Sequence, residues 1–366
     1  MSGARGAGAA ALAAAALAAA PAAHAAAPSA ALTKWNAIDG AVLTGDALIA
    51  LEVETVRVRQ GGTRARPGPV AVTYHAAIAV EAGLTARRTR FVRNRFSTAV
   101  AVRTSIGAMN GGRIAAGDGR FVVLPGGRGF APPVVWCCGG GREVVVASDG
   151  RAGAPVPVAA GIDGERVRVL MRTADGATRL VSASPHALPG PDAPDPTVTD
   201  AAAPGAPARG TSAVGAGVAA WTDDPAGGVL WIGTPSDGGV AAPRAVRVGG
   251  RILGVWTDAG TVAVLLRQGR QVRVARIAPG ATSPAIVWRG ARVPRVGLGG
   301  GTLAVADGRV VFASRSGAVR RVSRTRGPVA AVAADGDRVA WFERIQRRGP
   351  DGLERRTVAR LAQVAR

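Results

Sequence analysis

The sequence predicts an all-β fold built from repeated four-stranded units, and three observations lead to this prediction. Short apolar runs rich in β-branched residues recur along the chain, and most are bounded by Gly or Pro. The dipeptide Asp-Gly, which suits tight turns, occurs nine times. Apolar residues at helical spacing are nearly absent, although the alanine content would permit helices.

Seven apolar runs that begin after an Asp/Gly turn define the repeat. They align on Leu48, Phe121, Val167, Val218, Val262, Leu303 and Val339. The intervals are 73, 46, 51, 44, 41 and 36 residues, and the last five lie near the length of one propeller blade, about 40–45 residues. We therefore expect a β-propeller of six to eight four-stranded antiparallel blades, with seven as the preferred number.

The stretch GVAAWTDDPAGGVLWIG, residues 217–233, illustrates the unit. We expect residues 218–222 to form the first strand of a blade and residues 229–234 the second, joined by an Asp-rich turn. Trp221 and Trp341 fall at matching positions of two such first strands. This repetition predicts packing in the core rather than stacking on a ligand.

Blades with a VAW-like strand, a polar turn and an LWI-like strand resemble those of the secreted TolB-like and WD40-like β-propellers. The similarity is clearest over residues 215–361 and weaker over residues 44–183. The Trp-Asp and Gly-His dipeptides of WD40 repeats are missing, and Trp-Thr-Asp at 221–223 and 256–258 comes nearest to them. The resemblance implies a disc with a central channel that serves in protein or ligand binding.

Two regions interrupt the repeat. The first interval is longer than the others, which predicts an insertion or an additional blade. Residues 184–210 contain seven prolines and predict an exposed loop or a linker. A linker would divide the chain into two β domains, 28–183 and 211–366. We favour one closed ring over residues 28–366, because closure removes exposed sheet edges.

The ends of the chain bear on this closure. Residues 28–44 precede the first repeat and lack a blade of their own. We expect this N-terminal segment to complete the last blade by strand exchange.

The first 27 residues have the features of a secretory signal peptide. Arg5 is their only charged residue, an Ala/Leu run covers residues 9–20, and Ala23-His24-Ala25 fits a cleavage site. No later stretch is long and apolar enough to span a bilayer. We therefore expect a secreted or extracytoplasmic protein of the cell envelope, without a transmembrane segment in the mature chain.

Cleavage after Ala25 would leave 45 basic against 24 acidic residues, a formal charge of +21. Such a charge favours a protein or an anionic envelope polymer as partner, and export makes nucleic acid an unlikely one. The candidate anion-binding surface is an Arg-rich segment, with Arg87, Arg88, Arg90, Arg93 and Arg95 within nine positions. The alternative is a basic strand face with no partner.

Residues suited to catalysis are scarce. Outside the signal peptide there are two His, one Tyr and one Lys. We expect no catalytic, cofactor-binding or metal-binding residues and no cofactor. Cys137 and Cys138 are the only cysteines, and they could form a vicinal disulfide, pack as free thiols or bond to another molecule.

Up-and-down strand order predicts which connections share a face of the disc. It places five candidate binding residues and the Pro-rich loop at one entrance to the channel: Cys137, Cys138, Asp118, Asp163 and Asp335. We expect an exported, monomeric, non-catalytic binding protein. The alternatives are a carbohydrate-active lyase or glycosidase with its site at the channel mouth, and a basic envelope protein that holds anions by charge alone.

Overall fold

The computed structural model describes residues 29–34, 37–44, 47–59, 69–85, 88–97, 102–104, 113–117, 120–124, 134–137, 140–143, 156–163, 166–183, 197–200, 207, 210–236, 239–350 and 352–364. Side chains are described from residue 156 onward within these ranges, apart from 183, 197–200 and 347, and at residues 38, 40–43 and 48–50. The proposed signal peptide lies outside the described residues.

The described strands form seven antiparallel sheets. The first contains β2 (Ala37–Thr44), β3 (Ala47–Arg59), β4 (Pro69–Thr85) and β5 (Arg88–Ser97), with β6 (Val102–Thr104) also paired to β4. The second contains β7 (Arg113–Gly117), β8 (Arg120–Leu124), β9 (Val134–Cys137) and β10 (Gly140–Glu143). The third contains β11 (Val156–Asp163), β12 (Arg166–Arg172), β13 (Thr178–Ala183) and β14 (Thr197–Asp200).

The other four sheets follow the same order. They contain β15 (Ser212–Gly215), β16 (Val218–Trp221), β17 (Val229–Ser236) and β18 (Gly239–Arg247); then β19 (Arg251–Asp258), β20 (Thr261–Gln268), β21 (Gln271–Ile277) and β22 (Ala285–Gly290). The next contains β23 (Arg295–Gly299), β24 (Thr302–Ala306), β25 (Arg309–Ala313) and β26 (Val319–Arg324). The last contains β27 (Val329–Asp335), β28 (Arg338–Gly349), β29 (Gly352–Gln363) and β1 (Ser29–Lys34).

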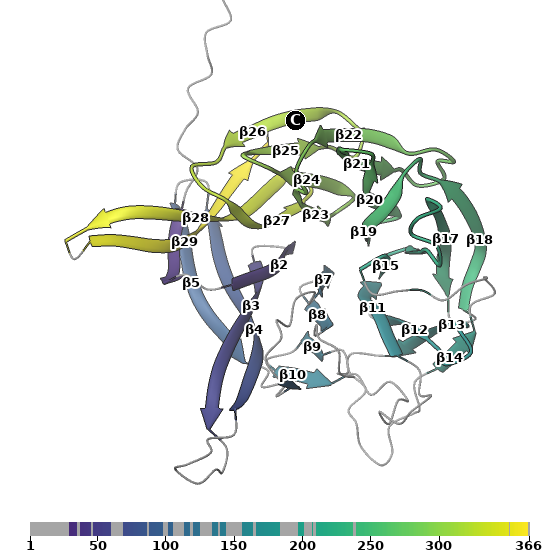
Figure 1. Cartoon of the computed structure of the whole chain (residues 1–366), viewed down its shortest axis with the longest axis horizontal. Helices are drawn as coiled ribbons and strands as arrows, with labels where there is room; N and C mark the ends of the chain where they lie inside the picture. The colour runs from purple at the N-terminus through teal and green to yellow at the C-terminus, as the bar shows by residue number, and fades with distance from the viewer. Residues whose placement is uncertain are drawn as a thin grey trace, which may run out of the picture.

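The sheets surround a common centre, as in a β-propeller (Figure 1). The first strand of each sheet contacts the first strands of the sheets on either side, from β7 through β11, β15, β19 and β23 to β27. Strand β2 contacts both β7 and β27 and so joins the two ends of this series. The predicted all-β propeller fold is confirmed.

The N-terminal strand joins the last sheet, as the sequence predicts. Strand β1 pairs with β29, and Ser29 lies opposite Arg360. The prediction is wrong for the rest of the segment, because residues 37–44 form β2, the first strand of the following sheet. The side chains of Ile38 and Leu43 are buried in the hydrophobic cluster that also contains Phe342. This short segment therefore forms part of the hydrophobic core.

The predicted repeat is present, but the prediction that the aligned runs are first strands is wrong. All seven aligned positions lie in second strands, which are β3, β8, β12, β16, β20, β24 and β28. The 217–233 hairpin therefore joins the second and third strands of its sheet. A second strand is covered on both faces by neighbouring sheets and carries the longest apolar run, and all five residues of β24 are buried. Trp221 and Trp341 are both fully buried, which confirms their core role.

The two irregular regions differ from expectation in detail. The surplus residues of the first interval lengthen β3 and β4 to 13 and 17 residues and add β6 to the same sheet. Within the Pro-rich segment, Thr197–Asp200 forms β14 and pairs with β13 as a fourth strand. Its β-branched Thr-Val-Thr sequence suits a strand.

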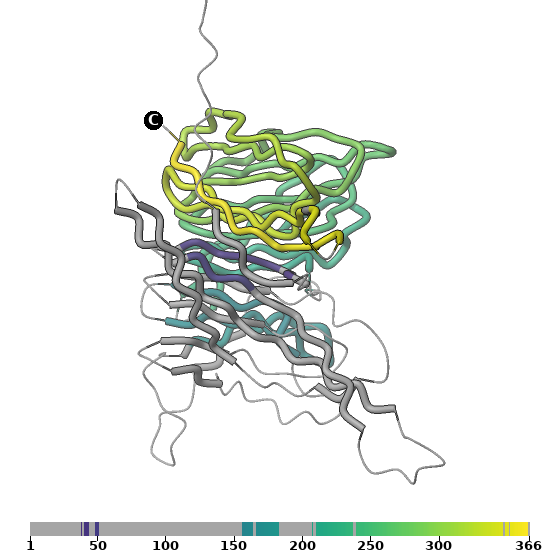
Figure 2. The backbone as a smooth tube through the Cα atoms, turned by 90° about the vertical axis from the view of Figure 1, so that its left-hand side faces the viewer, coloured from purple at the N-terminus to yellow at the C-terminus, as the bar shows by residue number. Residues whose placement is uncertain are grey.

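The inner strands pack closely, and the described strands run across the thickness of the disc (Figure 2). A Cβ atom added to Gly161 would lie 1.8 Å from the Val214 carbonyl oxygen, and one added to Gly299 would lie 1.9 Å from that of Ala334. Glycine is thus required where these inner strands meet. No helix among the described residues is long and apolar enough to cross a membrane.

Candidate functional site

Strand alternation gives the ring two faces. We name the turn face after the connections between first and second strands, including residues 163–166, 258–261 and 335–338; the third-to-fourth connections share it. We name the link face after the links between sheets, including residues 290–295 and 324–329; the second-to-third connections share it.

Two of the predicted binding residues have described side chains on the turn face. Asp163 and Asp335 end the inner strands β11 and β27. The Asp163 carboxylate accepts a hydrogen bond from the Gly217 amide at 3.3 Å and pairs with Arg168 at 3.5 Å. The Asp335 carboxylate pairs with Arg338 at 3.0 Å. These contacts stabilise the turns, and a role in recognition stays a prediction.

Asp258 occupies the same position at the end of β19, although the sequence did not suggest it as a site. Its carboxylate accepts a hydrogen bond from the Gly301 amide of the next sheet at 3.4 Å. Burial raises the pKa of the Asp258 carboxyl above 3.8, and the charge of Asp335 raises it further, while amide donors at Gly300 and Gly301 oppose the shift. Asp163 and Asp258 therefore both connect neighbouring sheets on the turn face.

The other predicted residues are less fully described. Cys137 ends β9, a third strand, which places its backbone toward the turn face. Cys138, Asp118 and Arg87 lie outside the described residues. Four of the predicted anion-binding residues, Arg88, Arg90, Arg93 and Arg95, fall in β5, an outer strand of its sheet, and their anion binding stays a prediction.

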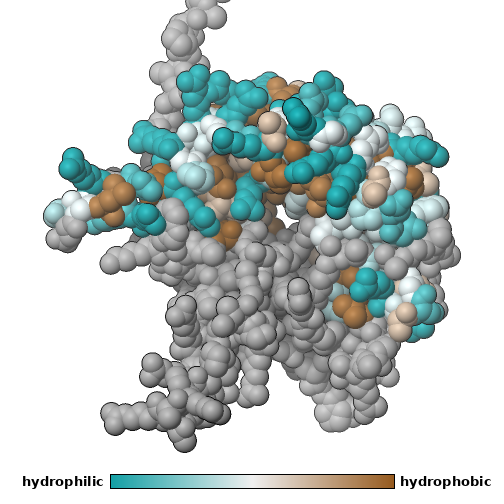
Figure 3. Space-filling model, viewed as in Figure 1, coloured by the Kyte–Doolittle hydropathy of each residue, from teal (hydrophilic) through white to brown (hydrophobic). Residues whose placement is uncertain are grey.

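A small cavity lies among the inner strands. It measures about 60 Å³ and is lined mainly by apolar residues of these strands, among them Ile162, Trp256 and Leu298. Ligand pockets typically measure roughly 300–1,000 Å³, whereas a cavity of this size holds a few waters. In Figure 3, apolar residues gather toward the centre of the ring and polar ones toward its rim.

A larger depression lies on the link face. It measures about 600 Å³ and lies between three connections, residues 292–295, 306–308 and 325–329, which we call the basic groove. Arg292, Arg295 and Arg326 are exposed along it, and Asp307 is the one acidic residue of its lining. Val293, 53% exposed, adds an apolar contact surface.

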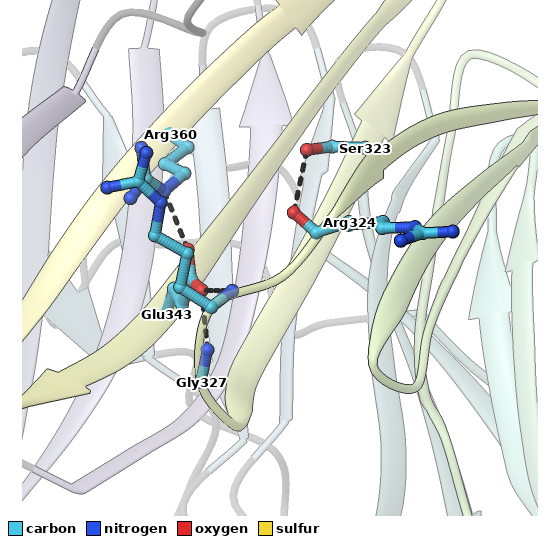
Figure 4. A network of polar contacts seen from close by, with 6 residues as sticks. Ser323, Arg324, Gly327, Glu343 and Arg360 are labelled. Atoms are coloured by element: carbon cyan, nitrogen blue, oxygen red, sulfur yellow. Dashed lines mark hydrogen bonds and ion pairs between the residues drawn. The ribbon is translucent and has the colours of Figure 1, made fainter.

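A buried carboxylate holds one side of the basic groove (Figure 4). Glu343 on β28 has a side chain only 1% exposed. It accepts hydrogen bonds from the backbone amides of Arg326 and Gly327, the latter at 2.7 Å. Arg360 Nε on β29 donates to the other carboxylate oxygen at 2.6 Å. The Glu343 carboxylate thus fixes the backbone from which Arg326 projects.

Backbone contacts complete this support. The Thr325 amide donates to the Gly308 carbonyl at 3.1 Å, and the Arg344 amide donates to the Pro328 carbonyl at 2.9 Å. A Cβ atom added to Gly327 would lie 1.9 Å from the Arg344 carbonyl oxygen, so the loop rests directly on β28. The basic groove is therefore formed before any ligand arrives.

The groove suits acidic groups. Guanidinium groups bind carboxylates and phosphates through paired hydrogen bonds. Among the described residues, no group of three or more His, Cys, Asp or Glu could hold a metal ion. A signal for the site was present in the sequence, because residues 320–326 contain four arginines, a density similar to that of 87–95.

No family model matches the chain, and no curated protein matches its sequence. Several solved structures are similar in fold. The RRP9 WD40 repeats show 9% identity and a TM-score of 0.49, over 91% of this chain and 97% of that one. The β-propeller domain of the Trilobed protease from Pyrococcus furiosus shows 8% identity and a TM-score of 0.47, over 91% and 99%. YCF48 bound to D1 peptide shows 10% identity and a TM-score of 0.45, over 93% and 95%.

Proposed function

We propose that this chain is an exported, non-catalytic binding protein whose basic groove binds an acidic partner. The observation that carries this proposal is the basic groove itself, a space of about 600 Å³ whose lining includes three exposed arginines and one aspartate. A protein segment or an anionic envelope polymer would supply the matching charges.

The support beneath the groove favours specific binding over loose attraction by charge. Glu343 and Arg360 hold the loop that carries Arg326, so less ordering is needed when a ligand binds. A buried acid below a basic surface weakens its positive potential. The presence of Glu343 is therefore better explained by its role in holding the loop than by an effect on the charge of the groove.

The proposal includes export and a single ring. Residues 1–27 would be removed as a signal peptide, and residues 28–366 would act as one monomeric propeller in the cell envelope or outside the cell. The pairing of β1 with β29 supports this arrangement, because it joins the first and the last described strands in one sheet. The intact mass of the exported protein would show the loss of the leader.

Binding of poly-glutamate to the mature chain tests the proposed site. The triple variant Arg292→Ser, Arg295→Ser and Arg326→Ser should weaken affinity about tenfold or more, since each exposed charge contributes up to about 1 kcal/mol. The matched control replaces Arg251, Arg267 and Arg270, three exposed arginines of a neighbouring sheet, with Ser. Both triple variants lower the net charge by three.

Comparison of the two triple variants distinguishes binding at the basic groove from attraction by the overall positive charge. We expect the control to retain most of the affinity and both variants to melt close to the unaltered chain, because exposed substitutions change stability little. Equal losses in the two variants would replace the groove with an unspecific charge effect. Absence of binding by the unaltered chain would overturn the proposal.

A further inference from the structure

We propose that the ligand of the basic groove is an acidic polypeptide segment in extended conformation, which continues from the groove along β26 and pairs with its open edge. This inference rests on the proposed function and names the partner class of the same site. It follows from three features of the sheet that contains β23 to β26.

The first feature is a row of like charges that begins at the groove. Arg324 lies directly opposite Arg309, and Arg321 lies opposite Val311. The pairing shifts register between Val310 and Val311, so Arg321 and Arg324 lie opposite Val311 and Arg309, which are alternate residues of β25. Directly opposed residues share a face and alternate residues of a strand do too, so Arg309, Arg321 and Arg324 lie on one face. All three are exposed. Arg309 directly follows the groove residue Gly308, and Arg324 directly precedes the groove residue Thr325. We call these three residues the arginine row.

The second feature is the lack of a matching acid. None of the three arginines forms an ion pair with another residue in the part of the chain that the structure describes. Like charges directly opposed across a strand pair are destabilising. The Arg324 guanidinium projects away from the Glu343 carboxylate (Figure 4). Carboxylates of a ligand would remove the repulsion between Arg309 and Arg324.

The third feature is the sheet edge. Strand β26 is six residues long and ends the order of its sheet, with β25 on its inner side. In the part of the chain that the structure describes, no strand pairs with its outer edge. Backbone amides and carbonyls at a sheet edge can pair with an extended peptide, whereas a polymer without amides cannot pair in this way. Arginines on an outer strand also protect an edge against aggregation. That role does not account for Arg309, which lies one strand further in.

These features together favour an extended segment with several acids on one face. In a strand, alternate side chains point to one face about 7 Å apart. A peptide paired with β26 could therefore direct its acidic side chains toward the arginine row while its other residues point away. Its continuation past Arg324 would enter the basic groove beside Arg326.

The test uses the mature chain and the hexapeptide Glu-Thr-Glu-Thr-Glu-Thr, matched to the length of β26. We expect Arg321→Ser with Arg324→Ser to weaken its binding about fivefold or more. The control replaces Arg247 and Arg289, exposed residues of the outer strands β18 and β22, and should leave affinity nearly unchanged.

Two further probes examine the backbone pairing. N-methylation of alternate amides in the hexapeptide removes hydrogen-bond donors without changing the charge. The methyl groups can be placed on either of two alternating sets of amides, and only one set would point toward β26. Methylation of that set should weaken binding about fivefold or more. Linear polyphosphate of equal charge should bind more weakly than the peptide, because it has no backbone amides to pair with the edge of β26.

The outcomes separate this inference from the proposed function. Equal binding of polyphosphate and peptide, with no effect of N-methylation on either set of amides, would overturn the extended-peptide proposal and leave the groove as an anion site. If the hexapeptide, polyphosphate and poly-glutamate all fail to bind, the proposed function is overturned as well.

Discussion

The two faces of the ring use charged residues in opposite ways. On the turn face, Asp163 and Asp258 accept hydrogen bonds from turns of the following sheets, and Asp335 pairs with Arg338. On the link face, Arg292, Arg295 and Arg326 lie exposed around a groove, and the acid beneath them is buried. Polar groups whose partners lie within the chain stabilise the ring, whereas exposed charges of one sign are available to a ligand.

The largest effect should come from removing the acid below the groove. Glu343→Ala leaves Arg360 and two amides without their carboxylate and should lower the free energy of unfolding by about 3–5 kcal/mol. Chemical denaturation of the mature chain measures this loss. Glu343→Gln keeps an acceptor of the same size and should cost less.

Substitution of Glu343 also distinguishes two effects on the affinity for poly-glutamate, that of the ordered loop and that of the charge. Removing a negative charge near a basic groove would strengthen poly-glutamate binding if charge alone mattered. Loss of the fixed loop predicts weaker binding instead, and Glu343→Gln allows the measurement in a better folded protein. Tighter binding by this variant would show that the support of the loop is unimportant.

A smaller effect is expected on the turn face. Asp163→Ala removes a hydrogen bond to Gly217 and an ion pair with Arg168, and should lower stability by about 1–2 kcal/mol. Because this face lies away from the groove, affinity for poly-glutamate should stay within about twofold at moderate ionic strength. A strong loss of affinity would move recognition to the turn face, as the sequence predicted.

The smallest effect concerns the pH dependence of Asp258. Its raised pKa means that the folded chain holds this proton more tightly than the unfolded chain does, so the stability it contributes is present below pH 3.8 and is lost as pH rises through the folded pKa. Asn at this position cannot titrate. As the pH rises from about 3 to about 7, the melting temperature of Asp258→Asn should therefore increase relative to that of the unaltered chain. A difference that does not vary with pH would contradict this.

The repeat and the closing strand could be predicted because they depend on local features. The apolar runs at Leu48 and Val339 mark buried second strands, and a short segment before the first repeat pairs with β29. The position of the run within its sheet could not be read from periodicity, since first strands are also apolar. Trp221 and Trp341 were identified as core residues on the basis of their repetition alone.

The groove could not be predicted in the same way. It joins residues 292–295, 306–308 and 325–329, which meet only because two sheet links and a turn lie on one face. Glu343 and Arg360 belong to strands, where an acid and a base 17 residues apart give no sign of pairing. The arginine density at 320–326 was visible, but its meaning depended on Arg309 lying opposite Arg324.

Amide hydrogen exchange of the mature chain, with and without saturating poly-glutamate, compares the two faces directly. Binding at the basic groove predicts added protection in residues 290–295, 306–309 and 319–328, with little change in residues 163–166, 258–261 and 335–338. Protection confined to the second group, or spread evenly over both faces, would contradict the assignment of recognition to the link face.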